Sequence, residues 1–344
     1  MVDSPPPAPL PPHVQVMQTI MAMLPARILS ALAELAIPDV IGDGAKSAQE
    51  VALALAAHEP WVLRLMRAAA SLGVLRARDD GTFENTLLGS ALRSDTPMSV
   101  RALGVLVNEP FHYMAWGELA RGVRTGEVPF ERAHGRTFFE HLRQHPAANA
   151  SFAAWMTQTS AVVTAAVLAS YDFSNARTIV DVGGGQGALL GAVLGVAPRA
   201  RGILYDTPDV VRDTAPLDVL GVRDRCEVIG GDFFESVPAG GDLLMLKTVL
   251  HDWDDDACVA ILRRCRESVG DTAGARLLIL ESVLPADCSP HPGFGMDINM
   301  LVLNHGGRER TGPEFAGLLA EAGFHAERTI TIPGPLSIVE ATPA

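Results

Sequence analysis

Cysteine is scarce in this chain, and long apolar runs and an excess of basic residues are absent. The four cysteines, at positions 226, 258, 265 and 288, form no C-x-x-C pair, so we expect reduced thiols in a cytoplasmic protein. No apolar run reaches the roughly 18 residues of a membrane-spanning helix, and residues 1–7 lack the segments of a signal peptide. The net charge of −13 argues against a nucleic-acid surface. We therefore expect neither membrane nor nucleic acid as a partner.

The length and the residue pattern predict two domains behind a short tail. A chain of 344 residues fits two domains, and its proline-rich residues 1–12 should be disordered. Residues 13–100 should form helices and a hairpin. Ser47 and Glu50 have the spacing of a helix capping box, and residues 74–85 read as a hairpin with an Asp-Gly turn. Helices followed by such a hairpin make a winged-helix shape.

A winged helix can bind DNA, or it can serve as a packing or dimerisation module. Residues 1–100 carry seven basic and ten acidic side chains, a net charge of −3. Phosphate contacts dominate affinity for DNA, so this surface is poorly equipped for it. The N-terminal helices are very apolar, with Ile20, Met21, Met23, Leu24, Ile28, Leu29, Leu32 and Leu35. These residues either form a dimer interface or fill the core of the monomer.

The rest of the chain divides into a second helical stretch and an alternating α/β region. Residues 101–176 are rich in Phe, Met, Trp and His, which fits core packing or the wall of a pocket for an aromatic substrate. From residue 177 on, strand and helix patterns alternate, which predicts a largely parallel sheet. Strands are expected near 178–182, 202–206, 225–230, 242–247, 275–281, 325–332 and 336–341, and helices near 187–196, 208–214, 255–269 and 312–322.

A glycine turn follows the first of these strands, in the run Asp181-Val182-Gly183-Gly184-Gly185-Gln186-Gly187. The order strand, turn, helix brings bare backbone and a helix N-terminus against a nucleoside-bearing ligand. The G-x-G-x-G spacing differs from that of dinucleotide sites, and the Lys-Ser/Thr pair of a triphosphate loop is missing. Asp206, after the second strand, could accept both ribose hydroxyls. Asp232 and Phe233, after the third, could bind and stack on an adenine.

A second polar cluster closes the fourth strand, in the run Leu246-Lys247-Thr248-Val249-Leu250-His251-Asp252-Trp253-Asp254-Asp255. Glu281 ends the fifth strand, and Glu309 lies in the later run Asn304-His305-Gly306-Gly307-Arg308-Glu309-Arg310-Thr311. A lone histidine is more often a capping or core residue than a catalytic one. Ligands of parallel sheets bind beyond the carboxyl ends of the strands, so these polar residues predict a site there.

Together these segments resemble the class I S-adenosylmethionine-dependent O-methyltransferases of the caffeate type and of bacterial natural-product tailoring, such as the anthracycline, mitomycin and phenazine enzymes. The resemblance covers nearly the whole chain. It implies an α/β fold, with a Rossmann-like doubly wound methyltransferase sheet whose last strand is antiparallel. Residues 13–100 would be a mostly helical, winged-helix-like dimerisation domain that interlocks in a homodimer. Residues 101–176 would be a helical linker and substrate-pocket region, and 177–344 the catalytic domain.

The resemblance also implies the roles of individual residues. His251 would be the general base, with Glu281 and Glu309 as the acids that orient and polarise it. Cofactor-binding residues would be Asp181, Gly183, Gly185, Asp206, Asp232, Phe233 and Lys247. Substrate-binding residues would be Asp252, Trp253, Met156, Asn304 and Met300. The implied cofactor is S-adenosyl-L-methionine, which leaves as S-adenosyl-L-homocysteine, and no metal is expected.

The chemistry of a phenol agrees with these roles. A phenol with a pKa near 10 is ionised in only about one molecule in a thousand at pH 7, a deficit worth roughly 4 kcal/mol. A neutral imidazole with a pKa near 6.5 can take the proton as attack begins, and a carboxylate on its far nitrogen fixes the tautomer. The sulfonium methyl is already activated, so in-line alignment completes the reaction. We expect methylation of a phenolic hydroxyl on an aromatic, polycyclic natural product.

Several alternatives stay open at this point. The same site could methylate an amine, because an amine also loses a proton. Some family members keep the cofactor site but hydroxylate or decarboxylate an aromatic polyketide. More remote are an NAD-dependent oxidoreductase and a non-catalytic winged-helix regulator. The sequence does not identify the aromatic substrate.

Overall fold

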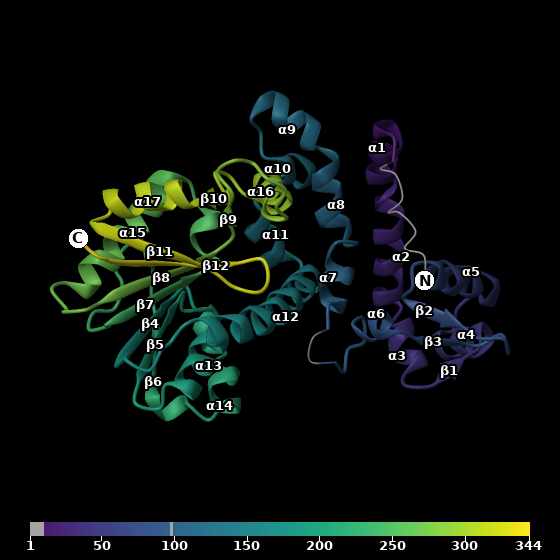
Figure 1. The fold of residues 1–344 in the computed structure, drawn as a ribbon, viewed down its shortest axis with the longest axis horizontal. Helices are drawn as coiled ribbons and strands as arrows, with labels where there is room; N and C mark the ends of the chain where they lie inside the picture. The colour runs from purple at the N-terminus through teal and green to yellow at the C-terminus, as the bar shows by residue number, and fades with distance from the viewer. Residues whose placement is uncertain (1–9, 97–98) are drawn as a thin grey trace, which may run out of the picture. The chain divides into compact units, whose positions relative to one another are not determined.

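The computed structural model describes residues 10–96 and 99–344, and the chain divides into two compact units (Figure 1). Unit 1 comprises residues 1–113 and 147–158, and unit 2 comprises residues 114–146 and 159–344. A disordered tail was expected over residues 1–12, and residues 1–9 of it lie outside the described residues. At the end of this stretch a helix begins, at Pro12. The domain boundaries expected at residues 100 and 176 stay a prediction.

Unit 1 is a small helical body with a three-stranded sheet. Its elements are α1 (Pro12–Met21), α2 (Met23–Glu34), α3 (Ile37–Ile41), β1 (Ala45–Lys46), α4 (Ala48–Leu55), α5 (Glu59–Ser71), β2 (Leu75–Ala77), β3 (Phe83–Asn85), α6 (Leu87–Ser90) and α7 (Arg101–Leu106). The capping box is confirmed, because Ser47 Oγ accepts the N–H of Glu50 and the Glu50 carboxylate accepts the N–H of Ser47. The hairpin is confirmed as well, with β2 antiparallel to β3 and β1 on the other side of β3.

Two helices have residues in both units. They are α8 (Pro110–Gly117) and α12 (Pro146–Ser170). By length and composition, the stretches Pro12–Glu34 and Pro146–Ser170 could each cross a membrane, although the sequence holds no unbroken apolar run of that length. This is weak evidence for a span, because core helices of soluble proteins meet the same criterion. The expectation that a membrane is no partner stays a prediction.

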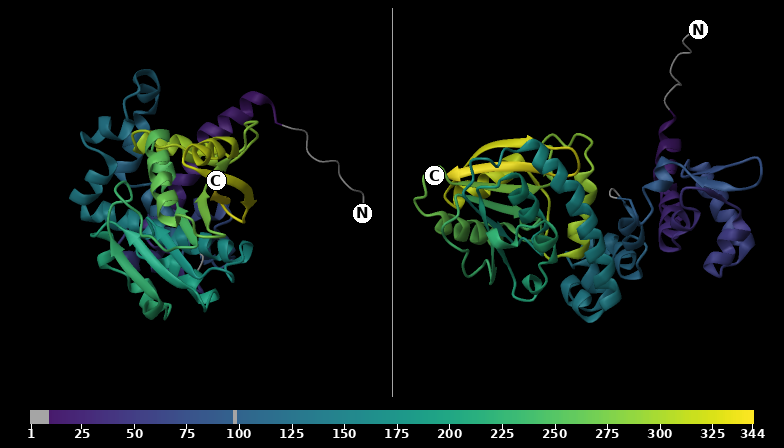
Figure 2. Two further views of the ribbon diagram at one scale, coloured as in Figure 1. Left: turned by 90° about the vertical axis from the view of Figure 1, so that its left-hand side faces the viewer. Right: turned by 90° about the horizontal axis from the view of Figure 1, so that it is seen from below.

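Unit 2 is built on a seven-stranded sheet with the order β11-β12-β8-β7-β4-β5-β6. The strands are β4 (Thr178–Val182), β5 (Arg201–Asp206), β6 (Cys226–Gly230), β7 (Leu243–Lys247), β8 (Arg276–Glu281), β11 (Phe324–Thr331) and β12 (Ser337–Pro343). Strands β4 to β8 run parallel, whereas the last strand, β12, is antiparallel to both neighbours. Figure 2 shows β11 and β12 side by side in yellow. The expected fold class is confirmed.

Each face of this sheet is covered by helices. Alternate side chains of a strand point to opposite faces. On β7, Leu244 and Leu246 pack with α15 (Asp255–Val269) and α17 (Gly312–Glu321), while Leu243 and Met245 pack with α12 and α13 (Ala188–Val196). Because both faces of such a strand are buried, its sequence is a continuous apolar run and does not alternate between apolar and polar residues. The three helices expected near 187–196, 255–269 and 312–322 are confirmed.

The expected helix over residues 208–214 is wrong in type and extent. Only a single 3-10 turn, η1 (Val210–Arg212), forms there, and α14 (Ala215–Val219) follows with Pro216 in its first turn. Proline favours the start of a helix over its interior, so the segment breaks in two. The helical stretch expected over residues 101–176 includes three further helices, α9 (Leu119–Thr125), α10 (Pro129–His134) and α11 (Phe138–Gln144). The sequence did not predict η2 (Arg223–Arg225), β9 (Val283–Leu284), α16 (Gly293–Leu303) or β10 (Arg310–Thr311).

Candidate active site

The glycine turn lies between β4 and α13, and its backbone explains the G-x-G-x-G spacing. Gly183, Gly185 and Gly187 all have positive φ, at 68°, 61° and 85°. Side chains other than glycine rarely adopt this conformation. The position of Gly183 is also crowded, because a Cβ there would lie 2.8 Å from Cγ2 of Val249. The turn therefore presents bare backbone close to the segment that carries His251.

Three of the expected cofactor residues surround this turn. Asp206, at the end of β5, accepts the N–H of Gly185 at 2.8 Å. A carboxylate has about four acceptor positions, so Asp206 can still accept hydroxyl groups. Asp232 follows β6, is exposed and accepts the N–H of Phe234 at 2.8 Å. Cε1 of Phe233 lies 3.8 Å from the place of a Gly183 Cβ.

A buried pair of opposite charges lies beneath the turn. Asp181 is 1% exposed, and a Cβ on Gly184 would lie 2.7 Å from its Cγ. Burial raises the pKa of Asp181 to about 7, against the opposing effect of Lys247. Lys247 Nζ donates to Ser160 on α12 and to Thr248 Oγ1, both at 3.3 Å. Burial lowers the pKa of Lys247, whereas Asp181 raises it. The two buried groups shift each other's pKa, but among the described residues no hydrogen bond or ion pair joins them.

His251 lies on a 3-10 turn, η3 (Leu250–Asp252), directly beyond β7. Thr248 links strand and turn with a φ of +51°, a left-handed conformation that costs a residue other than glycine about 1 kcal/mol or more. The Glu281 carboxylate, at the end of β8, holds this turn. Its Oε1 accepts the N–H groups of Val249 and Leu250, both at 2.9 Å.

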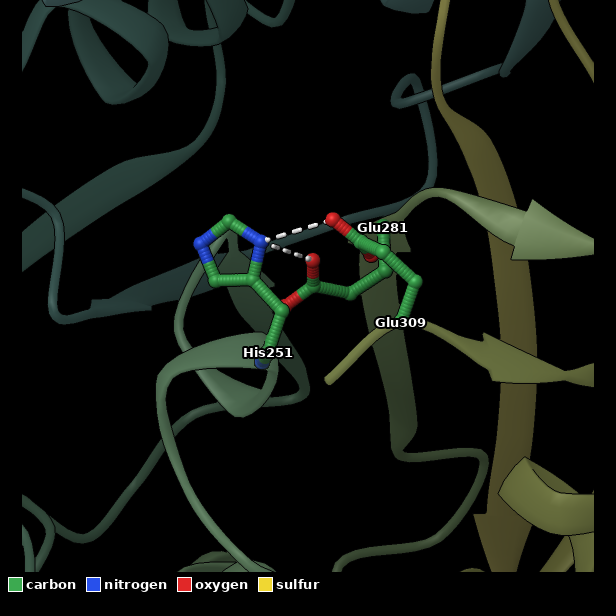
Figure 3. Close-up of side chains that lie close together, drawn as sticks. All are labelled: His251, Glu281 and Glu309. Carbon is green, nitrogen blue, oxygen red and sulfur yellow. Dashed lines mark hydrogen bonds and ion pairs between the residues drawn. The ribbon is translucent and has the colours of Figure 1, made fainter. Parts of the chain in front are cut away.

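The structure brings the three predicted catalytic residues together (Figure 3). Nδ1 of His251 lies 3.2 Å from Oε1 of Glu309 and 3.7 Å from Oε2 of Glu281, and the two glutamates are 3% and 0% exposed. Because both acids face Nδ1, the imidazole carries a proton there. Nε2 points away from both acids in Figure 3, so it is the nitrogen that can exchange a proton with a substrate.

The environment changes the pKa of His251 from the ordinary value near 6.5. Burial alone lowers the pKa, but Glu281 and Glu309 outweigh it and raise the pKa of His251 to about 10. Burial raises the pKa of Glu281 to about 7, while His251 opposes that shift. The expectation of a neutral imidazole with a pKa near 6.5 therefore needs correction: the nearby acids make His251 a stronger base, and they also keep it mostly protonated at pH 7.

The residues expected to bind the substrate occupy different surroundings. Asn304 Nδ2 donates to Asp252 Oδ1 at 2.8 Å, beside His251. Trp253 packs edge-on against Phe234, with 4.8 Å between the ring centroids. Met300, on α16, is buried, and Met156 is half-buried on the part of α12 that belongs to unit 1. Their contacts with a substrate stay a prediction.

A cavity of about 500 Å³ lies beside this cluster, within unit 2. Glu309 and Asn304 line it, together with Asp297 and Arg308. Asp297 Oδ1 accepts the N–H of Glu309 at 2.9 Å and so fixes the acid that contacts His251. The sequence reasoning missed Asp297, and it missed the buried Arg310 next to Glu309. The one signal for Arg310 in the sequence is its place directly after Glu309 in the run Asn304–Thr311.

His251, Glu281 and Glu309 also have the geometry of a possible metal site. One ligand atom from each lies within 4.8 Å of the others. The same spacing suits a shared proton, because Glu309 accepts a hydrogen bond from Nδ1. The cluster can therefore act in acid–base chemistry with its own residues alone.

Known proteins resemble this chain over nearly its full length. The family model of the O-methyltransferase domain matches residues 116–325, and that of the O-methyltransferase dimerisation domain matches residues 17–95. The phenazine O-methyltransferase of Lysobacter antibioticus is 41% identical over 95% of both chains. The 8-amino-8-demethylriboflavin N,N-dimethyltransferase of Streptomyces davaonensis is 36% identical over 87% of this chain and 86% of its own.

A solved structure shows the same fold with its ligand. CalO1, a methyltransferase of calicheamicin biosynthesis, was solved in its S-adenosylhomocysteine-bound form. It is 30% identical, covers 96% of this chain and 98% of its own, and has a TM-score of 0.86. The resemblance inferred from the motifs is thus confirmed: the chain belongs to the O-methyltransferase family.

Proposed function

We propose that this S-adenosylmethionine-dependent O-methyltransferase methylates a phenolic hydroxyl of an aromatic, polycyclic natural product. The observation that carries the proposal is the arrangement of His251, whose Nδ1 faces two buried acids while Nε2 is turned away from them. Relatives that act on phenazine and on a naphthoate support an aromatic acceptor. The family uses S-adenosylmethionine and needs no metal.

The raised pKa of His251 suits proton transfer from a phenol. A phenol has a pKa near 10, and the pKa of His251 is raised to about 10. Matching values make the transfer from a phenol to neutral His251 nearly neutral in free energy. At pH 7, however, a base with this pKa is itself mostly protonated, so His251 must first lose a proton, and methylation should become faster as the pH rises toward 10. Glu281 and Glu309 stabilise the imidazolium that results.

In this proposal, residues at the carboxyl edge of the sheet would hold the cofactor. The glycine turn, with Gly183 and Gly185, would leave room for the amino-acid end. Asp206 would accept the ribose hydroxyls, and Asp232 and Phe233 would contact the adenine. When bound, S-adenosylmethionine supplies the activated methyl group, and the residues of this chain position it and remove the proton of the acceptor.

An amine is the second candidate for the acceptor. One relative, 36% identical to this chain, is an N,N-dimethyltransferase by name, which supports an amine as an acceptor. The same His251 could take the proton that an amine loses.

We also propose that the protein is a cytoplasmic homodimer without nucleic acid or membrane as a partner. The match to the dimerisation domain and the exposed apolar side chains of α1 and α2 support the dimer. The net charge of −13 supports the absence of nucleic acid.

The test is methyl transfer from labelled S-adenosylmethionine to a panel of aromatic hydroxyls and amines. We expect phenols to be methylated, and we expect His251→Ala to lower kcat by about 10²- to 10⁴-fold, the usual contribution of a general base. S-adenosylhomocysteine should bind this variant with unchanged affinity in calorimetry. His325→Ala, on the exposed face of β11, is the control. Methylation by His251→Ala at the wild-type rate would show that another group is the base.

A further inference from the structure

Arg310 is a fully buried charged residue that directly follows Glu309 in the chain. Its side chain is 1% exposed. Burying a guanidinium is costly unless its donors are paired, so the partners of this group indicate its purpose. None of the roles derived above uses it.

The partners of Arg310 are the backbone carbonyls of the turn that carries His251. Nη1 donates to the carbonyl of Leu250 at 3.0 Å, and Nη2 donates to the carbonyl of Trp253 at 2.8 Å. Nε and Nη2 donate to Oδ1 of Asp255, at 2.9 Å and 2.7 Å. The guanidinium therefore contacts the residues on both sides of His251 and Asp252.

The other side of the same turn is held by Glu281. Its Oε1 accepts the N–H groups of Val249 and Leu250, and the N–H of His251 lies 3.4 Å away. The carbonyl of His251 is also occupied, because it accepts the backbone N–H of Arg308 at 2.8 Å. The Glu281 carboxylate thus accepts N–H groups of the turn. The guanidinium of Arg310 donates to carbonyls at the two ends of the same turn.

We propose that Arg310 is a positioning residue that fixes the His251 turn, so that Nδ1 stays in contact with Glu309. This inference rests on the proposed role of His251 as the base. The rigid planar fork reaches two carbonyls and a carboxylate at once. A lysine offers a single nitrogen in place of the three that donate here, so it cannot keep these contacts together.

The test compares Arg310→Lys with Arg263→Lys in the full-length protein. Arg263 is the control, because it lies on α15, the helix that begins at Asp255, while its side chain is 55% exposed and pairs with Glu321 at 3.1 Å. We expect Arg310→Lys to lower kcat at least tenfold with less than a twofold change in KM for S-adenosylmethionine. Arg263→Lys should leave both unchanged. A folded Arg310→Lys protein with wild-type kcat would overturn the proposal.

A spectroscopic measurement separates positioning from a purely structural role and does not depend on the substrate. The protein is labelled with ¹³C-histidine, and the His251 signal is identified by its loss in His251→Gln. In Arg310→Lys the pKa of His251 should move down toward 6.5, because the contact with Glu309 loosens. An unchanged titration in folded Arg310→Lys would overturn the proposal, even if no phenol were found to be methylated.

A second variant covers the case in which Arg310→Lys fails to fold. Asp255 is 55% exposed, and its replacement in Asp255→Ala removes the carboxylate that anchors the fork but no buried group. We expect a severalfold lower kcat and a shift of the His251 titration in the same direction. Asp256→Ala, at the next position of α15, is the control. Wild-type kcat and titration in Asp255→Ala would contradict a positioning role.

Discussion

At the scale of single residues, the site depends on how buried acids change one imidazole. Burial disfavours the charged form of His251, yet Glu281 and Glu309 reverse that effect and raise its pKa to about 10. The same burial raises the pKa of Glu281 to about 7. His251 and Glu281 therefore form a coupled pair, and their protons belong to the pair more than to either residue.

This coupling predicts how stability depends on pH. A histidine whose pKa is raised in the folded state binds its proton more tightly there than in the unfolded chain, where the pKa is near 6.5. Its stabilising contribution is complete below pH 6.5 and disappears as the pH rises toward about 10. We expect the free energy of unfolding of the wild type, relative to His251→Gln, to fall across this window. Urea unfolding at pH 6.5, 8 and 9.5 measures it, and a constant difference would contradict the assigned shift.

At the scale of elements, strands, turns and helices place these residues at one edge of the sheet. The parallel strands β4 to β8 end at the same edge, which brings Asp181, Asp206, Lys247 and Glu281 together. The glycine turn then passes close to Val249, the residue that leads into the His251 turn. The proposed methyl-donor site and the proposed proton-accepting site are thus in contact through Gly183 and Val249.

Two glycine substitutions test this packing, and they should act in opposite directions. Gly183→Ala places a Cβ at a φ of +68° and 2.8 Å from Val249, so it should cost about 1–3 kcal/mol in stability and weaken binding of S-adenosylhomocysteine. Gly195→Ala lies within α13 with no atom within 4 Å of its Cβ. It should stabilise by about 0.5–1 kcal/mol. Urea unfolding and calorimetry measure both, and unchanged ligand affinity in Gly183→Ala would contradict the role of the turn.

At the scale of the whole molecule, the apolar side chains of the first two helices divide into two groups. Leu32 is fully buried in the core of unit 1, whereas Ile20 and Met23 are 70% and 62% exposed. Part of this apolar stretch therefore fills the core of unit 1, while the exposed part agrees with the proposed dimer interface. Exposed apolar side chains that gather on one segment are typical of an interface between proteins.

The proposed homodimer can be tested at these positions. Placing charges in Ile20→Glu/Met23→Glu should convert the dimer to a monomer, because a buried unpaired carboxylate is costly. Val219→Glu is the control, since Val219 is even more exposed, at 86%, but lies on α14 in unit 2. Light scattering at micromolar concentration distinguishes the states. A monomeric wild type, or a double variant that stays dimeric, would contradict this interface.

Local sequence patterns determined most of the fold. Apolar runs bounded by polar residues located the seven strands of the large sheet, and the capping box at Ser47 and the glycine turn marked the start of helices. These signals depend on residues within a few positions of one another, where backbone preferences and side-chain periodicity act directly. The prediction of a helix over residues 208–214 was wrong for an equally local reason, because Pro216 divides this part of the chain into two short elements.

The tertiary structure alone decided how the site is held. Glu281 was expected as a partner of the histidine ring, but it also accepts backbone N–H groups of the turn, and Arg310 holds the opposite side. Glu309 and Arg310 are nearly 60 positions from His251 in the chain, so no local pattern reports their contact. The pKa of His251 likewise depends on burial and on acids from two other segments. The sequence by itself determined which residues could react, while packing between distant segments decided their geometry and their charge.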